Sequence, residues 1–393
     1  MNIIKDLFCT CKRHGIKLLL LFLMLLSIMS SMHVYVKDAF SILLLIMLGV
    51  RKFDKTAKLL LCFSLTYSFF IFVKSPTNVT EIFSYLICPT TFYLLGKRII
   101  EESPSEQDML NVFIILTLGI NVVLWVNNVS DSIEYGIVNV ARVIENDTQR
   151  EISATLQGLL LSVGISGIGY TIASGSLFKW RSIVFLIFSL LSLFCTVHLV
   201  NRTGMVIFAI AVLVSMFFVF RQKKGYIVLA GLFLYAVYIL LSYYGIINEE
   251  ILDAYEARSF DQDTGGGRTE IWALSLSDLM NNPFGWEGRE IGYSKGYCHN
   301  LWLDVARRAG WLPFFFLVYI TIGKVKDLTK FAYKEKNILA GYMMSLIVCA
   351  LVSSFMEPVI EGISLYFYFI CFLWGIQNDY ANKEFKDIFY CKC

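Results

Sequence analysis

Apolar residues occur along this chain in long blocks, with short polar segments between them. Many blocks reach the length of about 20 residues that a helix needs to cross a bilayer. The pattern predicts about twelve spanning helices, and Lys37 and Asp38 interrupt the second of them near its outer end. The expected spans are residues 17–32, 34–50, 57–73, 79–96, 109–127, 152–173, 181–200, 205–220, 226–244, 308–323, 338–356 and 363–377.

Composition excludes an ordinary soluble domain. The 393 residues are 57% hydrophobic and 17% charged, whereas globular proteins are about a quarter charged. Because lipid offers no partners for backbone polar groups, apolar spans must satisfy them internally as helices. We therefore expect an all-α polytopic membrane protein, with residues 1–393 forming a single integral membrane domain.

Lys and Arg are concentrated in alternate connecting segments, which indicates the orientation. The rich segments are 51–55, 97–98, 179–181, 221–224 and 324–336, and the poor ones are 75–78, 127–151 and 357–361. By the positive-inside rule, the rich segments face the cytoplasm. Both termini are then cytoplasmic and the poor segments external.

The longest external segment is residues 245–308, between the ninth and tenth spans. A loop of this length is more often functional than a passive connector. Three glycines at 265–267 precede a predicted helix over 269–280, and a second short helix is predicted over 301–308. The apolar face of the first helix would contain Ile271, Leu274 and Leu279.

Two external arginines are candidate anion-binding residues. Arg268 follows the three glycines and precedes a helix start, where free backbone N–H groups and a guanidinium suit a phosphate. Alternatively, it braces the loop through Asp261 or Glu270. Arg202 lies in the tight turn 201–204, where it would meet a lipid phosphate; the alternative is an arginine that snorkels to fix the depth of its span.

His299 is the candidate proton acceptor, because a neutral imidazole takes a proton from a hydroxyl near physiological pH. A lone His is often only structural. Asn300 is a candidate helix cap and a candidate substrate-binding residue. Arg142 and Arg150 would bind a second anionic group or pair with nearby acids. Further candidates are Arg258 at the start of the same polar stretch, and Glu357 and Glu361, which would position substrate hydroxyls or neutralise an arginine.

Several chemistries have no sequence signal. There is no Walker loop, no dinucleotide fingerprint and no external group of His and carboxylates with metal spacing. We therefore expect no metal, no cofactor and no nucleic-acid partner. Short cytoplasmic segments leave no room for a nucleotide-binding domain. Energy for a reaction would come from an activated substrate already in the membrane, such as a lipid-phosphate-linked donor.

The whole chain resembles the bacterial superfamily of O-antigen polymerases and O-antigen ligases. The resemblance rests on the many spans, Asn201–Gly204 between two of them, and a large late external loop. The loop contains Gly267-Arg-Thr-Glu-Ile-Trp272, Pro283-Phe-Gly285 and His299-Asn-Leu-Trp-Leu-Asp304, and Glu357–Gly362 is similar to the last external turn of the family.

This resemblance implies a function and residue roles. Such enzymes transfer glycans from undecaprenyl diphosphate at the periplasmic face of the inner membrane, without a metal or nucleotide. Arg202 and Arg268 would hold the diphosphate and His299 would deprotonate the acceptor hydroxyl. Other partners would be membrane lipids, a chain-length regulator and a flippase. Aromatic loop residues would stack on sugars or anchor at the interface, namely Trp272, Trp286, Tyr293 and Trp302.

The exact activity is open between related alternatives. A polymerase joins the glycan to another lipid-linked repeat, whereas a ligase transfers finished polymer to lipid A–core. The motifs beginning at Gly267 and His299 look more like those of polymerases. A flippase for lipid-linked sugars is the competing class, but it would place polar residues inside its spans, whereas the charged candidate site residues here lie in the external loops.

Overall fold

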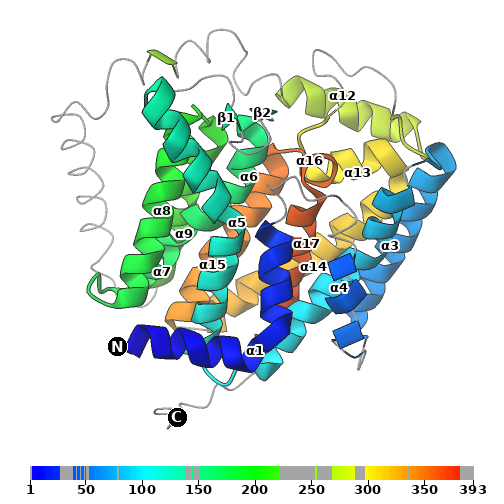
Figure 1. Ribbon diagram of the computed structural model, residues 1–393. Helices are drawn as coiled ribbons and strands as arrows, with labels where there is room; N and C mark the ends of the chain where they lie inside the picture. Colours follow the sequence, from blue (N-terminus) through cyan, green and yellow to red (C-terminus); the bar gives the residue numbers. More distant parts are fainter. Residues whose placement is uncertain are drawn as a thin grey trace. The chain divides into compact units, whose positions relative to one another are not determined.

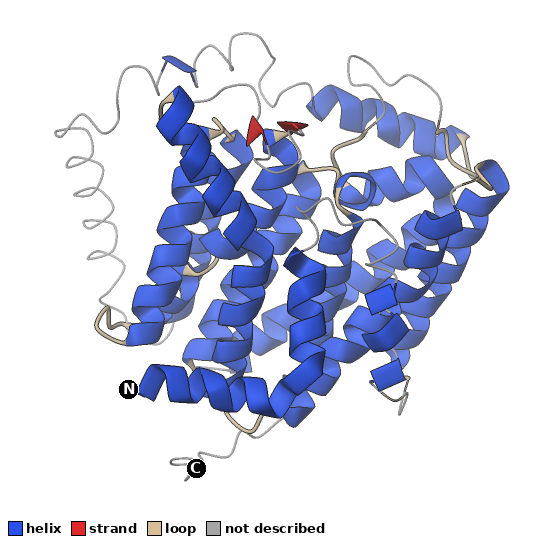
Figure 2. Ribbon diagram, in the orientation of Figure 1, coloured by secondary structure: helices blue, strands red, loops and turns tan. Residues whose placement is uncertain are grey.

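The protein is an all-α polytopic membrane protein. The computed structural model describes residues 2–26, parts of 39–49, 53–77, 79–137, 143–144, 151–220, 253–254, 268–287, 297–334 and 337–380. Helices make up almost all of these residues (Figure 2). Within them, seven helical segments are long and apolar enough to cross a membrane: Lys55–Lys74, Val79–Glu102, Glu106–Tyr135, Ala154–Ser174, Trp180–His198, Arg202–Val219 and Ile338–Met356.

Two further helices occupy predicted spans. Helix α14 (Trp311–Lys334) and helix α17 (Ser364–Tyr380) cover most of the predicted spans 308–323 and 363–377. The span predicted at 226–244, and most of that at 34–50, lie outside the described residues. The total of twelve spans therefore stays a prediction.

The chain divides into two compact units, of which the first is Met1–Ile120, Glu270–Phe331 and Pro358–Cys393. Its longer helices are α1 (Asn2–Leu26), α3 (Lys55–Lys74), α4 (Val79–Glu102), α14 and α17 (Figure 1). Helices α4 and α17 pack backbone to backbone. A Cβ on Gly96 would lie 2.1 Å from the Phe372 carbonyl oxygen, and one on Gly375 would lie 2.0 Å from that of Tyr93. Small residues thus permit the close approach on which helix association in membranes depends.

The second unit is Asn121–Thr269 and Ala332–Glu357. It contains α6 (Ala154–Ile165), α7 (Ile168–Ser174), α8 (Trp180–His198), α9 (Arg202–Phe220) and α15 (Ile338–Met356). Its core includes Ile165, Ile207, Ala211 and Cys349. Strands β1 (Val143–Ile144) and β2 (Glu151–Ile152) form one short antiparallel pair.

One predicted span is interrupted. Residues 152–173 form α6 and α7 rather than one helix, with the break at Ser166 and Gly167. At this break the chain approaches α8 closely, since a Cβ on Gly167 would lie 2.8 Å from the Phe185 carbonyl oxygen. Close packing against α8 therefore overrides the continuous apolar pattern.

Helix α5 (Glu106–Tyr135) is longer than predicted, continuing two turns past residue 127 into the expected external loop. Two of its polar residues there, Asn128 and Asp131, are buried and hydrogen-bonded. The Asn128 amide donates to the Leu124 carbonyl at 2.8 Å and to the Gln157 side chain at 2.7 Å. Polarity that predicted a loop instead forms internal hydrogen bonds, which removes the cost of burying it.

Candidate functional site

Arg268 is the first residue of α12 (Arg268–Asn281), and its guanidinium joins residues distant in sequence. Nη1 donates to Thr203 Oγ1 at 3.1 Å, and Nη2 donates to Glu357 Oε1 at 3.2 Å. The Glu357 side chain is 1% exposed, while Arg268 keeps 22% of its side chain exposed. The acid paired with Arg268 is thus Glu357, for which neutralising an arginine is one of the two expected roles, and not Glu270. Asp261 lies outside the described residues. The structure therefore brings Arg268 and Glu357, two predicted site residues, together next to Thr203, the residue that follows Arg202.

The turn that carries Arg202 is tighter than predicted. Arg202 is already the first residue of α9, because the Asn201 side chain caps this helix. Asn201 Oδ1 accepts from the Gly204 backbone N–H at 3.0 Å, and Asn201 Nδ2 donates to the Ala154 carbonyl at 2.8 Å. Val200 has a φ of 48°, which a β-branched residue adopts only under strain. A fixed, strained turn therefore holds Arg202.

A buried histidine lies at the start of the same turn. His198 ends α8, and its side chain is 0% exposed. Nε2 lies 2.8 Å from Asp131 Oδ2, and Nδ1 lies 2.9 Å from the Ile137 carbonyl oxygen. Both ring nitrogens are thus engaged by the C-terminal end of α5 and the chain that follows it. The pair fixes the backbone just before Val200.

His299 lies in a second strained turn. Its φ is 49°, and the backbone N–H groups on either side of it converge on one carboxylate. The Cys298 N–H donates to Asp304 Oδ1 at 2.7 Å, and the Asn300 N–H donates to Asp304 Oδ2 at 3.3 Å. The centroid of the half-buried imidazole is 6.4 Å from that of Tyr297. Asp304 therefore fixes the backbone that presents His299.

Asn300 caps helix α13 (Leu301–Ala309), as predicted. Its Oδ1 accepts from the N–H groups of Trp302 and Leu303, each at 3.2 Å. Capping of this kind satisfies donors that the first helical turn leaves without intrahelical partners. The side-chain oxygen of this predicted substrate-binding residue therefore has a structural role here.

Both strained turns coincide with predicted site residues. In the part of the chain that the structure describes, the non-glycine residues with positive φ are Val200 and His299. Such conformations cost about 1–3 kcal/mol each and persist where surrounding structure enforces them, often at functional sites. This coincidence is independent of the sequence motifs that singled out Arg202 and His299.

Two buried acids lie in and beside α13, with Asp304 in its first turn and Glu361 against Arg307 of its last turn. Arg307 Nε donates to Glu361 Oε1 at 3.3 Å and Arg307 Nη2 bonds to Glu361 Oε2, with both side chains under 8% exposed. Burial raises the pKa of the Asp304 carboxyl above its ordinary value. Burial also raises the pKa of Glu361, and the nearby Asp304 raises it further, while Arg307 lowers it. Both carboxyls therefore accept a proton at higher pH than exposed acids do.

The Arg307–Glu361 pair allows a stability prediction. Arg307→Met should destabilise the protein by about 3–5 kcal/mol, because it leaves a buried carboxylate without its cation. The double variant Arg307→Met, Glu361→Gln removes both charges and should recover most of the loss. Thermal unfolding of the detergent-solubilised proteins measures both. Equal melting points for the single and double variants would contradict the assigned partnership.

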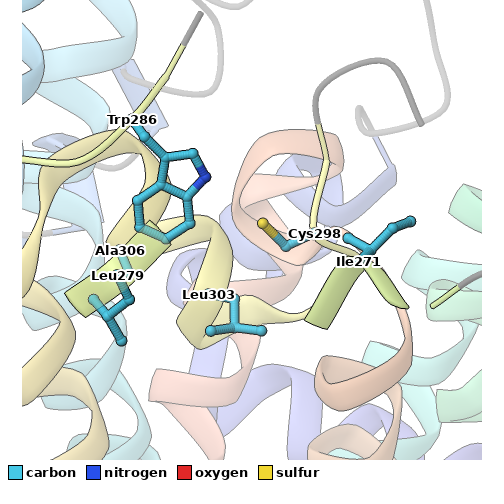
Figure 3. Close-up of a cluster of buried hydrophobic side chains, with 6 residues drawn as sticks. All are labelled: Ile271, Leu279, Trp286, Cys298, Leu303 and Ala306. Carbon is cyan, nitrogen blue, oxygen red and sulfur yellow. The ribbon is translucent and has the colours of Figure 1, made fainter. Parts of the chain in front are cut away.

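Helix α12 packs on α13 through a small apolar core. Ile271 and Leu279 of α12 pack with Trp286, Cys298, Leu303 and Ala306, all buried (Figure 3). Ser275 is buried between Ile271 and Leu279 along the helix, whereas Leu274 is 48% exposed. The prediction that Leu274 shares this face is wrong. With about 3.6 residues per turn, positions 275 and 279 lie to one side of Ile271 around the helix and position 274 lies to the other side.

The loop tryptophans differ in their surroundings. Trp272 is half-buried, and its indole N–H donates to the Cys298 carbonyl at 2.9 Å. Trp286 is 2% exposed and Trp302 is 6% exposed, with the Trp302 N–H bonded to Thr321 Oγ1 at 3.0 Å. The suggestion that Trp286 and Trp302 stack on sugars or anchor at the interface is therefore wrong, because both are core residues. Tyr293 lies outside the described residues.

Three predicted site residues lie outside the part of the chain that the structure describes, and sequence reasoning missed two of the interactions described above. Arg142, Arg150 and Arg258 lie outside the described residues. Sequence reasoning missed Asp304 as the carboxylate behind His299, although an acid in the first turn of a capped helix is a readable signal. It also missed the pairing of His198 with Asp131, which no local pattern indicates.

Comparison with known proteins finds a family match for one part of the chain. No curated protein matches the chain. Residues 187–318 match the family model described as O-Antigen ligase, a stretch that begins in α8 and ends in α14. It contains Arg202, Arg268, His299 and Asn300. The match supports an O-antigen ligase or polymerase type of membrane glycosyltransferase without distinguishing the two, and it confirms the resemblance to the O-antigen polymerase and ligase superfamily that the motifs indicate.

Proposed function

We propose that this protein polymerises a bacterial surface polysaccharide, such as O-antigen. It joins oligosaccharide repeats linked to undecaprenyl diphosphate at the periplasmic face of the inner membrane, with both termini in the cytoplasm. The observation that carries the proposal is the hydrogen bond from Arg268 to Thr203, 65 residues away. It supports an anion site built from the two predicted arginines, since Arg202 is the preceding residue in the same turn.

The chemistry is an inverting, metal-independent glycosyl transfer. An acceptor sugar hydroxyl attacks the anomeric carbon of the donor, a new C–O bond forms, and the bond to the diphosphate breaks. His299 takes the hydroxyl proton as general base. Arg202 and Arg268 stabilise the negative charge on the departing lipid diphosphate, as a metal ion does in other enzymes.

The remaining candidates act on the sugars or the arginines. Trp272 offers a half-buried ring to a sugar face. Glu357 holds the Arg268 guanidinium, which fixes its orientation toward phosphate oxygens. Glu361 pairs with Arg307 and supports the helix that follows His299. Arg142, Arg150 and Arg258 remain proposed contacts to the anionic or sugar parts of the substrate.

A ligase is the second candidate, because the matching family model is described as O-Antigen ligase. It would use the same donor and the same departing diphosphate with a different acceptor, a sugar of lipid A–core. The residues that hold the diphosphate and accept the proton would therefore be unchanged. Acceptor identity alone separates the two activities.

A glycan gel of a strain lacking this protein tests the proposal. We expect cores that carry a single repeat and no ladder, with activity restored by the wild-type gene. Bare cores together with long polymer on the carrier lipid would identify a ligase. Bare cores with single repeats trapped on the inner leaflet would identify a flippase and contradict the mechanism. An unchanged ladder would contradict the whole assignment.

A further inference from the structure

A basic pocket lies in the first compact unit, away from the residues assigned above. Its volume is about 350 Å³, and it is formed by the first turns of α3 and the part of α14 between Tyr319 and Lys330. Lys55, Lys324, Lys326 and Lys330 line it, with Asp327 as the acid among the lining residues. Four cations and one anion give the pocket a charge of +3. It therefore favours an anionic occupant.

Neighbouring acids leave most of this charge uncompensated. Asp327 Oδ2 lies 3.7 Å from Lys324 Nζ and forms an ion pair with that lysine. Asp54, the cap of α3, accepts from Lys97 at 2.6 Å and from the Tyr93 hydroxyl at 2.9 Å. Among the described residues, no carboxylate forms an ion pair with Lys55, Lys326 or Lys330.

Apolar surface adjoins the cations. Lys55 Nζ donates to the Tyr319 hydroxyl at 2.9 Å and lies 5.3 Å from the centre of its ring. Tyr319 is 54% exposed, Ile322 is 50% exposed, and Leu59 completes this wall. Lysine and tyrosine together at the end of a spanning helix are typical of the membrane–water interface. A phosphate ion would need only the lysines, whereas this wall also suits a hydrocarbon chain.

We propose that the pocket binds an anionic phospholipid, with its phosphodiester among Lys55, Lys326 and Lys330 and an acyl chain along Ile322 and Leu59. Basic pockets between spanning helices recognise lipid headgroups in this way. The lysine-rich segments that line it are those that the charge pattern assigns to the cytoplasm, so the lipid would come from the inner leaflet. This site is independent of the proposed glycosyl transfer.

The test is native mass spectrometry of delipidated full-length protein, titrated with phosphatidylglycerol in the presence of excess phosphatidylcholine. The variant Lys55→Gln, Lys326→Gln, Lys330→Gln removes three pocket charges. The matched control Lys5→Gln, Lys12→Gln, Lys179→Gln removes three exposed charges that do not line the pocket. Since each lysine near an anionic headgroup contributes about 1 kcal/mol, the pocket variant should bind the tightest lipid about a hundredfold more weakly. The control should match wild type.

Two further measurements distinguish a lipid site from misfolding of the variant and from a site for free phosphate. The corresponding Lys→Arg triple variant keeps the charge and should keep the affinity, which excludes misfolding as the cause of loss. Inorganic phosphate should not displace the lipid; displacement at equal concentration would assign the pocket to free phosphate and overturn the proposal. Equal losses in the pocket and control variants would show unspecific charge attraction and also overturn it.

Discussion

Replacing His299 with Gln is expected to lower kcat for glycan joining by about a hundred- to ten-thousandfold, the usual contribution of a general base. Gln keeps hydrogen-bonding groups of similar reach but does not accept a proton near neutral pH. The assay is the initial rate of chain extension by purified protein, with a lipid-diphosphate oligosaccharide as substrate. The limb of the wild-type pH–rate profile that reflects the base should disappear in the variant.

The same variant separates a base from a residue that only orients the acceptor. An orienting side chain acts through its hydrogen bond, which Gln can supply. Retention of kcat within about threefold, with the pH limb intact, would show that His299 orients the acceptor and that another group takes the proton. Thermal unfolding of the variant should match wild type, because the ring is half-buried rather than part of the core.

Asp304→Asn tests the support behind His299. The carboxylate accepts from two backbone N–H groups, at 2.7 and 3.3 Å, whereas an amide has one oxygen to offer. We expect about a tenfold loss of kcat, because the strained turn loses one bond, with the pH limb of His299 retained. A variant with lower stability and an unchanged kcat would show that Asp304 supports the fold and not the position of His299.

Local signals explain what the sequence could predict. Asn300 before an apolar helix predicts a cap because its side-chain oxygen needs only the next few N–H groups. The three glycines before Arg268 interrupt the preceding pattern, which predicts that a new helix begins after them. The helix face was half predicted: Ile271 and Leu279 are buried, but Ser275 lies between them in place of Leu274. Hydrophobicity alone does not tell which of two adjacent positions faces inward.

Long-range pairings explain what the sequence did not predict. Arg268 and Glu357 are 89 residues apart, and His198 and Asp131 are 67 apart. Any of several acids satisfies the charge rule for Arg268, and only the packing of the unit selects Glu357. Polarity at Asn128 and Asp131 predicts a loop, yet these residues extend α5 because buried partners satisfy them. The choice of partner belongs to tertiary structure.

Arg268→Gln should lower kcat by about a hundred- to a thousandfold, the loss typical of removing one donor to a developing anion. Glu357→Gln should cost about tenfold or less, since it loosens the guanidinium without removing it. Because the two side chains are in contact, their effects should not add. We expect the double variant to be as inactive as Arg268→Gln alone. Glu270→Gln, an exposed acid in the same helical turn, is the control and should be unchanged.

The stability of the double variant, unlike its activity, should differ from that of Arg268→Gln. Arg268→Gln leaves Glu357, which is 1% exposed, as a buried anion without its cation, so this variant should unfold at lower temperature. The double variant removes that anion and should regain stability while staying inactive. A stable but inactive double variant assigns Arg268 to the substrate. If the double variant instead recovers both stability and activity, Arg268 only neutralises Glu357 and the proposed diphosphate site is wrong. Additive losses would place Glu357 on the sugar rather than on Arg268, because a residue that acts through the guanidinium has nothing left to lose once the guanidinium is gone.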